Sequence, residues 1–272
     1  MRHIQLLGAA LFGLFSASPP TLAQTPAPAP AAAPAPLAPA AAPEETADTL
    51  LVRTDKQNAA FSDAFFHFKM VVKSATGAVE REIEFTTKQK GKAKRLVRFL
   101  SPGDLKGMGF LLASPGEMYA KLPAFGNRIR RIGTSQMNQG FLGSDLTTED
   151  MSTIDYAPMY AATHAGAEGS LRVLQLQLKP GMKSGFPRLK MWIDPKTATI
   201  TKIEYNDDAG KKLRTSERFD FKQDGPGHFS PGKMTYTDHR LRDHKTDMIL
   251  VKSSLNNGYK DDEFTQRALQ MD

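Results

Sequence analysis

Large apolar and polar side chains alternate one by one along several stretches of this sequence, most clearly over residues 65–73 and 170–205. Successive side chains of a strand point to opposite faces, so a period of two predicts half-buried antiparallel strands. The chain is therefore expected to form a sheet with one broad apolar face. The apolar side of the pattern includes Phe66, Phe68, Met70, Val72, Ile83, Phe85, Leu174, Leu176 and Leu178.

Strand signals recur at short intervals and are separated by turn sequences such as Ser101-Pro102-Gly103, Lys179-Pro180-Gly181 and Ser230-Pro231-Gly232. Strands at this spacing, joined by hairpins, predict a meandering antiparallel sheet or an incomplete barrel in one domain. The predicted strands span 64–74, 79–89, 92–101, 107–113, 116–122, 127–132, 155–164, 170–179, 187–194, 198–206, 211–221, 233–240 and 245–255.

Three short helices are predicted beside the strands. Residues 48–58 follow a capping Thr46 or Asp48, and a second helix begins at Thr147, with Asp150 reaching back to the cap. A third spans residues 261–269, with acidic residues in its first turn. A bare apolar sheet face would aggregate, so we expect these helices to cover the concave face.

The first 46 residues predict an export signal and a tether. Residues 1–23 combine Arg2, a short apolar run and a small-residue cleavage site ending at Ala23, which is typical of a secretory signal peptide. Residues 24–46 are rich in alanine and proline, and such a stretch stays disordered or extended. The folded domain is expected to span 47–272, and the protein is expected in a bacterial periplasm.

The composition narrows the classes of partner. No cysteine occurs, which excludes a disulfide framework, a thiolate metal site and a lipid-attachment cysteine. The net charge is +7, which usually suggests nucleic acid. For an exported chain we instead expect anionic lipid headgroups or an acidic protein surface to meet that charge, or no specific partner at all.

The apolar face has two interpretations. Phenylalanine, methionine and leucine dominate it, and flexible methionine suits a cavity that accepts varied chains. An ordinary core packed under helices is the alternative. The glycine-rich segment 107–112 lacks the spacing and the lysine of a phosphate loop, and a strand that another group approaches closely fits it better.

Polar clusters offer little chemistry. Arg128, Arg130 and Arg131 suit either contact with a phosphate or carboxylate, or a charged sheet edge that discourages aggregation. The histidines and aspartates within residues 238–244 are interleaved with basic residues, so a polar hairpin turn fits them better than a metal site. No nucleophile elbow and no poised carboxylate pair occur, so we expect no enzyme and no cofactor.

An ordered set of short motifs resembles the outer-membrane lipoprotein-sorting protein family, relatives of the LolA and LolB periplasmic lipoprotein carriers. The most specific motif is Gly143-Ser144-Asp145-Leu146-Thr147, and the likeness covers about residues 47–269. The others are Arg130-Arg131-Ile132, Trp192-Ile193-Asp194, Glu204-Tyr205, Gly210-Lys211, residues 234–238, His244-Lys245-Thr246 and residues 264–269.

The resemblance implies a mainly β fold, a strongly curved antiparallel sheet that forms an unclosed β-barrel with helices over its concave face. It also implies a soluble periplasmic carrier that holds lipid or lipoprotein acyl chains without a cofactor. Such a carrier would work between an inner-membrane exporter of the resistance-nodulation-division type and an outer-membrane acceptor. An accessory subunit that docks to the exporter and carries nothing is the alternative, and an envelope hydrolase is the third class.

These expectations assign roles to particular residues. The segment 141–150, with Gly143, Ser144, Asp145 and Thr147, is expected to position a covering helix, and Arg128, Arg130 and Arg131 to contact a headgroup or partner. The predicted lining of the hollow is Phe66, Phe68, Met70, Phe85, Phe110, Leu174, Leu176 and Met191.

Overall fold

The computed structural model describes residues 45–114, 116–122, 126, 128–133, 142–147, 149–150 and 155–271. All of them belong to the second of two compact units, residues 43–272. The predicted signal peptide and nearly all of the predicted tether lie outside the described residues.

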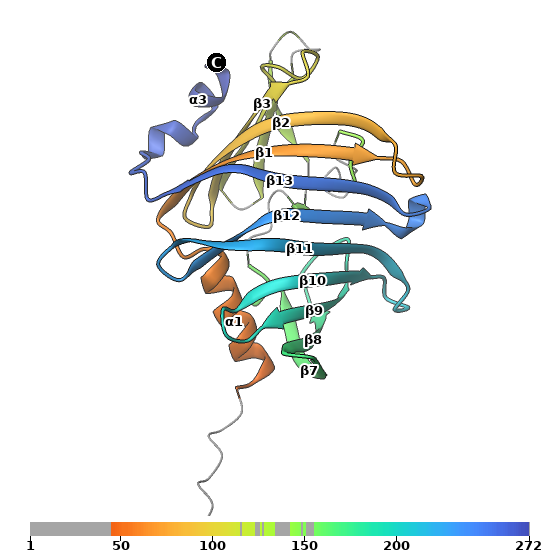
Figure 1. Cartoon of the computed structure of the whole chain (residues 1–272). Coiled ribbons are helices and arrows are strands. Elements are labelled where there is room, and N and C mark those ends of the chain that lie inside the picture. Colours follow the sequence, from red (N-terminus) through yellow and green to blue (C-terminus); the bar gives the residue numbers. More distant parts are fainter. Residues whose placement is uncertain are drawn as a thin grey trace, which may run out of the picture. The chain divides into compact units, whose positions relative to one another are not determined.

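One antiparallel sheet of 13 strands forms the body of this unit (Figure 1). Its order is β6-β5-β4-β3-β2-β1-β13-β12-β11-β10-β9-β8-β7, and it is not closed, because β6 and β7 stand at opposite ends. The strands are β1 (Asp63–Lys73), β2 (Val79–Lys90), β3 (Lys94–Ser101), β4 (Gly109–Ser114), β5 (Glu117–Lys121), β6 (Ile129–Ile132), β7 (Tyr160–Glu168), β8 (Leu171–Leu178), β9 (Arg188–Asp194), β10 (Thr199–Asn206), β11 (Lys212–Gly225), β12 (His228–Asp238) and β13 (His244–Leu255).

Each predicted strand has a counterpart, so the mainly β, unclosed fold is confirmed. Almost all sheet neighbours are also neighbours in sequence, except that β1 pairs with the last strand, β13. That pairing lies in the middle of the sheet and joins its two halves (Figure 1). The open edges are consequently formed by strands from the interior of the sequence.

One predicted turn was wrong. Ser230-Pro231-Gly232 lies inside β12, where Pro231 pairs with Phe221 of β11. The hairpin turn falls instead at Pro226-Gly227, where Gly227 has a φ of +69°. Proline followed by a glycine with positive φ suits a tight turn. The chain therefore turns at Pro226-Gly227, and the later Ser-Pro-Gly sequence stays in the strand.

The helix α1 (Ala47–Asn58) covers one end of the inner face of the sheet. Thr46 caps it by accepting a hydrogen bond from the backbone N–H of Thr49. Its buried side packs against β7, β10 and β12. The cluster beneath, here called the α1 cluster, comprises Ala47, Leu50, Leu51, Tyr160, Ala162, Leu174, Leu176, Phe186, Leu189, Met191, Ile193, Ile200, Ile203 and Tyr205.

A second cluster lies on the same inner face, over β1–β4, β12 and β13. A chain segment, residues 142–147, covers it, and we call it the segment-covered cluster. Its buried members are Met70, Val72, Ile83, Phe85, Val97, Phe99, Leu105, Met108, Leu146, Tyr236 and Met248, with Phe68, Phe110, Leu122, Leu142 and Met234 partly buried against them.

The C-terminal helix lies on the other face of the sheet, contrary to expectation. The predicted helix 261–269 is a 3-10 turn, η4 (Asp261–Phe264), followed by α3 (Gln266–Gln270). Phe264 and Leu269 pack on Leu96 and Leu111, which alternate along their strands with residues of the segment-covered cluster. A Cβ on Gly109 would lie 2.9 Å from Leu269 Cδ1, so this glycine allows the helix a close approach, as its strand was expected to do.

Candidate functional site

The segment 142–147 is fastened to the sheet through Asp145. Its carboxylate accepts hydrogen bonds from the Thr246 hydroxyl at 2.6 Å and contacts His244 Nδ1 at 2.7 Å. Its backbone N–H donates to the same Thr246 hydroxyl at 3.0 Å. Burial lowers the pKa of His244, but Asp145 and Glu80 together raise it above the ordinary histidine value. The motif at residues 143–147 and the motif at residues 244–246, which are far apart in the sequence, therefore form one attachment point.

The predicted cap at Thr147 is confirmed. The Asp150 carboxylate accepts from the Thr147 backbone N–H at 2.7 Å, and the Asp150 N–H donates to the Thr147 hydroxyl at 3.3 Å. Ser144 and Asp145 are buried beside it, while Gly143 is exposed with a φ of +77°. Glu149 and Asp150, which follow this cap, are helical, whereas residues 151–154 lie outside the described residues, as do Phe141 and Thr148.

Asp150 also makes a buried ion pair with Arg214 of β11. Two parallel hydrogen bonds of 2.5 and 2.6 Å join the guanidinium to both carboxylate oxygens. Arg214 Nη1 also donates a hydrogen bond to the Asp145 carbonyl oxygen at 3.0 Å. The Arg214 side chain is fully buried. Burial lowers the pKa of Arg214, yet the Asp150 carboxylate raises it well above its ordinary value.

Aromatic rings surround that guanidinium. The Arg214 carbon Cζ lies 4.1 Å from the ring centre of Tyr205 and 4.6 Å from that of Phe186. Tyr205 and Phe186 belong to the α1 cluster, and Tyr236, 5.5 Å away, belongs to the segment-covered cluster. Arg214 thus marks the boundary between the two apolar clusters.

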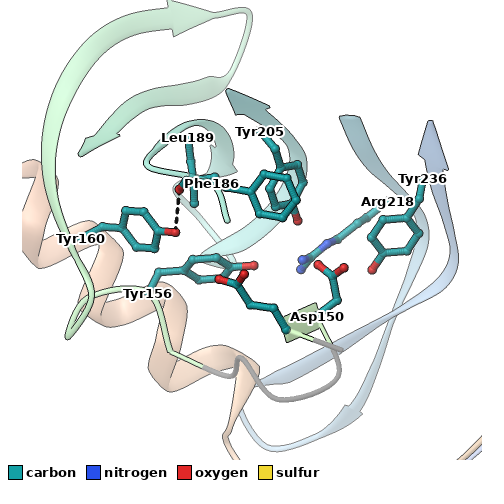
Figure 2. Close-up of a pocket in the computed structure, with 9 residues that line it drawn as sticks. Asp150, Tyr156, Tyr160, Phe186, Leu189, Tyr205, Arg218 and Tyr236 are labelled. Atoms are coloured by element: carbon teal, nitrogen blue, oxygen red, sulfur yellow. Dashed lines mark hydrogen bonds between the residues drawn. The ribbon is translucent and has the colours of Figure 1, made fainter. Parts of the chain in front are cut away.

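A small cavity opens at the same boundary (Figure 2). Its volume is about 90 Å³. In the close-up, Arg218 extends from β11 toward the centre, with Tyr156, Tyr205 and Tyr236 around it. The lining residues are Glu149, Asp150, Tyr156, Tyr160, Phe186, Leu189, Tyr205, Arg218 and Tyr236.

Burial raises the pKa of Tyr156, Tyr205 and Tyr236, so these phenols stay protonated at neutral pH. Arg218 differs from Arg214 in its partners. Within the described part of the chain Arg218 has no carboxylate at ion-pair distance, and its buried Nε has no hydrogen-bond partner. The cavity therefore holds hydrogen-bond donors and a cation with no anionic partner in that part of the chain.

Sequence reasoning did not find this polar site. The available signal was on β11, where Arg214, Ser216 and Arg218 occupy the alternate positions that carry apolar side chains on other strands. We call these three residues the β11 polar strip. Strand alternation places all three on one face.

The predicted lining residues fall into two sets. Leu174, Leu176 and Met191 lie in the α1 cluster and are 0% exposed. The other five lie in or beside the segment-covered cluster, where Met70 and Phe85 are buried and Phe66, Phe68 and Phe110 are only half-buried. Their assignment as a cavity lining stays a prediction.

Rings from four strands form a continuous row on the inner face, here called the phenylalanine row. Phe68 lies 5.6 Å from Phe85 between ring centres, and Phe85 lies 5.5 Å from Phe99. Phe66 extends the row at one end at 5.9 Å, and Phe110 extends it at the other at 6.0 Å. The row runs along β1 from Phe66 to Phe68 and then crosses β2 and β3 to Phe110 of β4.

The three arginines near β6 lie apart from these features. Arg128, Arg130 and Arg131 are exposed at the β6 end of the sheet. This position fits both interpretations given to them, a contact for anions and a charged edge. Their role as a headgroup or partner contact stays a prediction.

The polar turn between β12 and β13 has local partners. Asp238 pairs with Arg240, and His239 contacts Asp243 at 2.5 Å and the Thr215 hydroxyl at 2.7 Å. His244 is bound to Asp145, as described above. The described residues contain no group of three or more histidine, aspartate or glutamate side chains placed to hold a metal ion.

A family model described as "uncharacterized protein" matches residues 91–271. The search of curated proteins found no match. Among the helices in the described part of the chain, none is long and apolar enough to cross a membrane.

Several solved structures have the same fold. An outer membrane lipoprotein-sorting protein domain from Vibrio parahaemolyticus is 21% identical, with a TM-score of 0.72, and the match covers 83% of this chain and 98% of that one. A DUF1329 family protein from Desulfovibrio piger is 24% identical, with a TM-score of 0.73, covering 82% and 97%. A LolA superfamily protein from Nitrosomonas europaea is 16% identical, with a TM-score of 0.69, covering 82% and 99%.

Proposed function

Because the chain belongs to the family whose model spans residues 91–271 and has the fold of the LolA superfamily, we propose that it is a periplasmic carrier of acyl chains. It holds lipid, or the acyl chains of a lipoprotein, against the inner face of the sheet. The observation that carries this proposal is the phenylalanine row, which presents half-buried rings in an unclosed sheet.

The row is suited to hydrocarbon for a physical reason. Phe66, Phe68 and Phe110 keep part of their ring surface in contact with water, and so do Met234 and Leu122 nearby. Each methylene that leaves water for such a surface contributes about 0.8 kcal/mol. Contact with part of one acyl chain therefore supplies a useful binding free energy, and the exposed ring surface is buried at the same time.

We propose that the neighbouring cover, residues 142–147, moves when a guest binds. Residues 142–147 are fastened mainly through Asp145, Thr246, His244 and Arg214, by polar contacts. A guest that binds beneath this segment must shift its apolar residues Leu142 and Leu146. Binding and release then depend on the difference in affinity between the two positions of the segment.

Several finer features belong to the same proposal. Residues 1–23 direct export and are removed near Ala23, and residues 24–46 act as a tether for the carrier domain. The cargo moves between an inner-membrane exporter of the resistance-nodulation-division type and an outer-membrane acceptor. No hydrolysis by this chain is required for that transfer.

The test is a matched pair of substitutions on β1. Phe68→Glu places a charge within the row, whereas Phe65→Glu places the same charge on the opposite face of the same strand, at another half-buried position. Each protein is purified from cells, extracted with organic solvent and examined by mass spectrometry. We expect acyl species with the wild type and Phe65→Glu, and a large loss with Phe68→Glu.

Equal lipid yields from the two variants would contradict a role for the row. A wild-type preparation free of acyl species would remove the carrier proposal itself and favour an accessory subunit that docks to an exporter. Far-ultraviolet circular dichroism on all three proteins checks that the sheet is retained.

A further inference from the structure

A row of directly paired residues leads across the inner face from the polar cavity. Arg218 of β11 pairs with Met234 of β12, and Met234 pairs with Met248 of β13. Met248 pairs in turn with Met70 of β1, and Met70 pairs with Ile83 of β2. Directly opposed residues in antiparallel strands lie on the same face, so one cation is followed by four apolar side chains.

The dimensions of this row suit an amphiphile. Neighbouring strands are about 4.8 Å apart, so the four steps from Arg218 to Ile83 span about 19 Å. That is close to the length of an extended long-chain fatty acyl group. Methionine is flexible and polarizable, which lets such a track fit chains of different shape.

The positive charge of Arg218, at the start of the row, is not neutralised by the nearby carboxylates of Asp150 and Glu149. Both oxygens of the Asp150 carboxylate are engaged by Arg214. The Glu149 carboxylate accepts from the Ser184 hydroxyl at 2.5 Å and from the Gly185 N–H at 3.0 Å. The nearby acids thus already have partners, and neither forms an ion pair with Arg218 in the described part of the chain.

The groups around Arg218 are arranged to donate hydrogen bonds. The guanidinium, which hydrogen-bonds Tyr156, has only donors, and the protonated phenols of Tyr156 and Tyr205 can each supply one more (Figure 2). The Tyr236 hydroxyl donates to Met234 Sδ at 3.8 Å and would turn to reach an anion. A buried donor without a partner, such as Arg218 Nε, costs free energy that an anion would offset.

The cavity has the size of a headgroup. Its volume of about 90 Å³ is below the roughly 150 Å³ of a cavity that holds benzene. A hydrocarbon tail does not fit there, whereas a single carboxylate or phosphate group does. The tail must therefore leave the cavity, and Met234 is the adjoining residue along the row.

We propose that Arg218 and the surrounding tyrosines bind the anionic headgroup, a carboxylate or a phosphate, of an amphiphile whose tail lies along Met234, Met248 and Met70. This inference rests on the proposed function and adds a substrate class, single-headed anionic lipids. The tail displaces Leu142 and Leu146 of the covering segment, which pack in the same cluster.

The test compares probes that share a tail and differ in the headgroup. Palmitate carries a carboxylate, hexadecyl phosphate carries a phosphate, and methyl palmitate carries neither charge. Inorganic phosphate and acetate supply the headgroup without a tail. Binding to the full exported chain, stripped of lipid, is measured by titration calorimetry. We expect the two charged amphiphiles to bind at least about tenfold more tightly than methyl palmitate, because charge-assisted hydrogen bonds form at Arg218.

Arg218→Met tests the role of the positive charge, because methionine is also the residue type at the next positions of the row. It should weaken palmitate and hexadecyl phosphate by about tenfold or more while methyl palmitate binds unchanged. Lys222→Met removes an exposed positive charge from the same strand and should change nothing. If Arg218→Met does not fold, Arg218→Gln replaces it, since glutamine removes the charge but keeps a polar side chain, and the same loss of preference for charged amphiphiles is expected.

The other outcomes are distinct. If the variant that folds, Arg218→Met or Arg218→Gln, binds palmitate as the wild type does, the headgroup site is wrong and the carrier remains. If inorganic phosphate binds as tightly as hexadecyl phosphate, the site takes free anions and the amphiphile inference is overturned. If none of the three tailed probes binds the wild type, the proposed function itself fails.

Discussion

The two apolar clusters on the inner face of this sheet differ in where they leave side chains half-buried. The buried members of both clusters are at most 8% exposed. Under α1, Leu174, Leu176 and Met191 are 0% exposed, and the half-buried members lie at strand ends or in the loop before β7: Tyr156, Ala157, Met159, Leu178 and Leu213. Over β1–β4, the phenylalanine row combines buried Phe85 and Phe99 with half-buried Phe68 and Phe110. Strands with the same alternating pattern thus form a closed core at one end and a partly open surface at the other.

The covers explain this difference. The helix α1 contributes the buried residues Ala47, Leu50 and Leu51 to its cluster. The described segment 142–147 contributes only Leu142 and Leu146 to the other half. A cover with few apolar side chains leaves ring surface accessible, and we propose that acyl chains bind to that surface. The β11 polar strip lies between the two halves, so the boundary itself is polar, with Arg214 and Ser216 buried and Arg218 half-buried.

The largest effect is expected where the halves meet. Arg214→Met should lower the free energy of unfolding by about 3–5 kcal/mol, because it leaves the Asp150 carboxylate without its partner in a buried place. Urea denaturation measures the change. The double variant Arg214→Met with Asp150→Asn should recover a large part of the loss, and a double variant no more stable than the single one would contradict this explanation.

The clusters themselves should respond unequally to truncation. Leu176→Ala should cost about 3 kcal/mol, since it leaves a cavity in a filled core. Phe68→Ala, at a half-buried position, should cost only about 1–2 kcal/mol although more atoms are removed. Urea denaturation of both variants tests the comparison. Equal losses would show that the phenylalanine row is as tightly packed as the core under α1.

The attachment of α1 predicts a smaller, pH-dependent effect. Asp55 of α1 accepts hydrogen bonds from the backbone N–H groups of Tyr156 and Ala157, and burial raises its pKa to about 6. Because this pKa exceeds the value of 3.8 of an ordinary aspartate, the folded state binds more protons than the unfolded state between these values. The contribution of Asp55 to stability is therefore present at about pH 4 and is lost as the pH rises through 6.

Asp55→Asn removes that titration. The free energy of unfolding of the variant, relative to wild type, should shift in favour of the variant by about 2–3 kcal/mol between pH 4 and pH 7. Denaturation curves at several pH values measure the shift. A constant difference across this range would mean that Asp55 has an ordinary pKa, and that the α1 cover does not respond to pH through this residue.

Much of the fold could be predicted from the sequence because the alternating pattern of a strand depends only on residues that are close in sequence. The alternation around Phe66, Phe68 and Met70 specifies a strand and its apolar face without knowledge of any other residue. The cap formed by Thr147 and Asp150 is similarly local and was predicted correctly. The face of the sheet on which α3 packs was not predicted correctly, because both faces of β3 and β4 carry apolar residues. Val97 and Phe110 lie on one face, and Leu96 and Leu111 lie on the other.

The polar cavity depends on contacts between distant parts of the sequence. Arg218 is charged and lies in a strand next to exposed residues, so its sequence context predicts a solvated side chain. Its position beside Tyr156 and Tyr236 follows only when β11 pairs with β12 and Asp55 holds the backbone at Tyr156. Among the predicted site residues, none comes from β11.

By itself, the sequence determined that this chain forms antiparallel strands with one apolar face, because side-chain direction in a strand repeats every two residues. Which parts of that face are filled, and where a cation is left without an anionic partner among the described residues, was decided by the tertiary structure. Covers and partners come from segments such as α1, residues 142–147 and Asp150, which meet the sheet only after long loops have closed. Such non-local contacts leave no periodic pattern in the sequence.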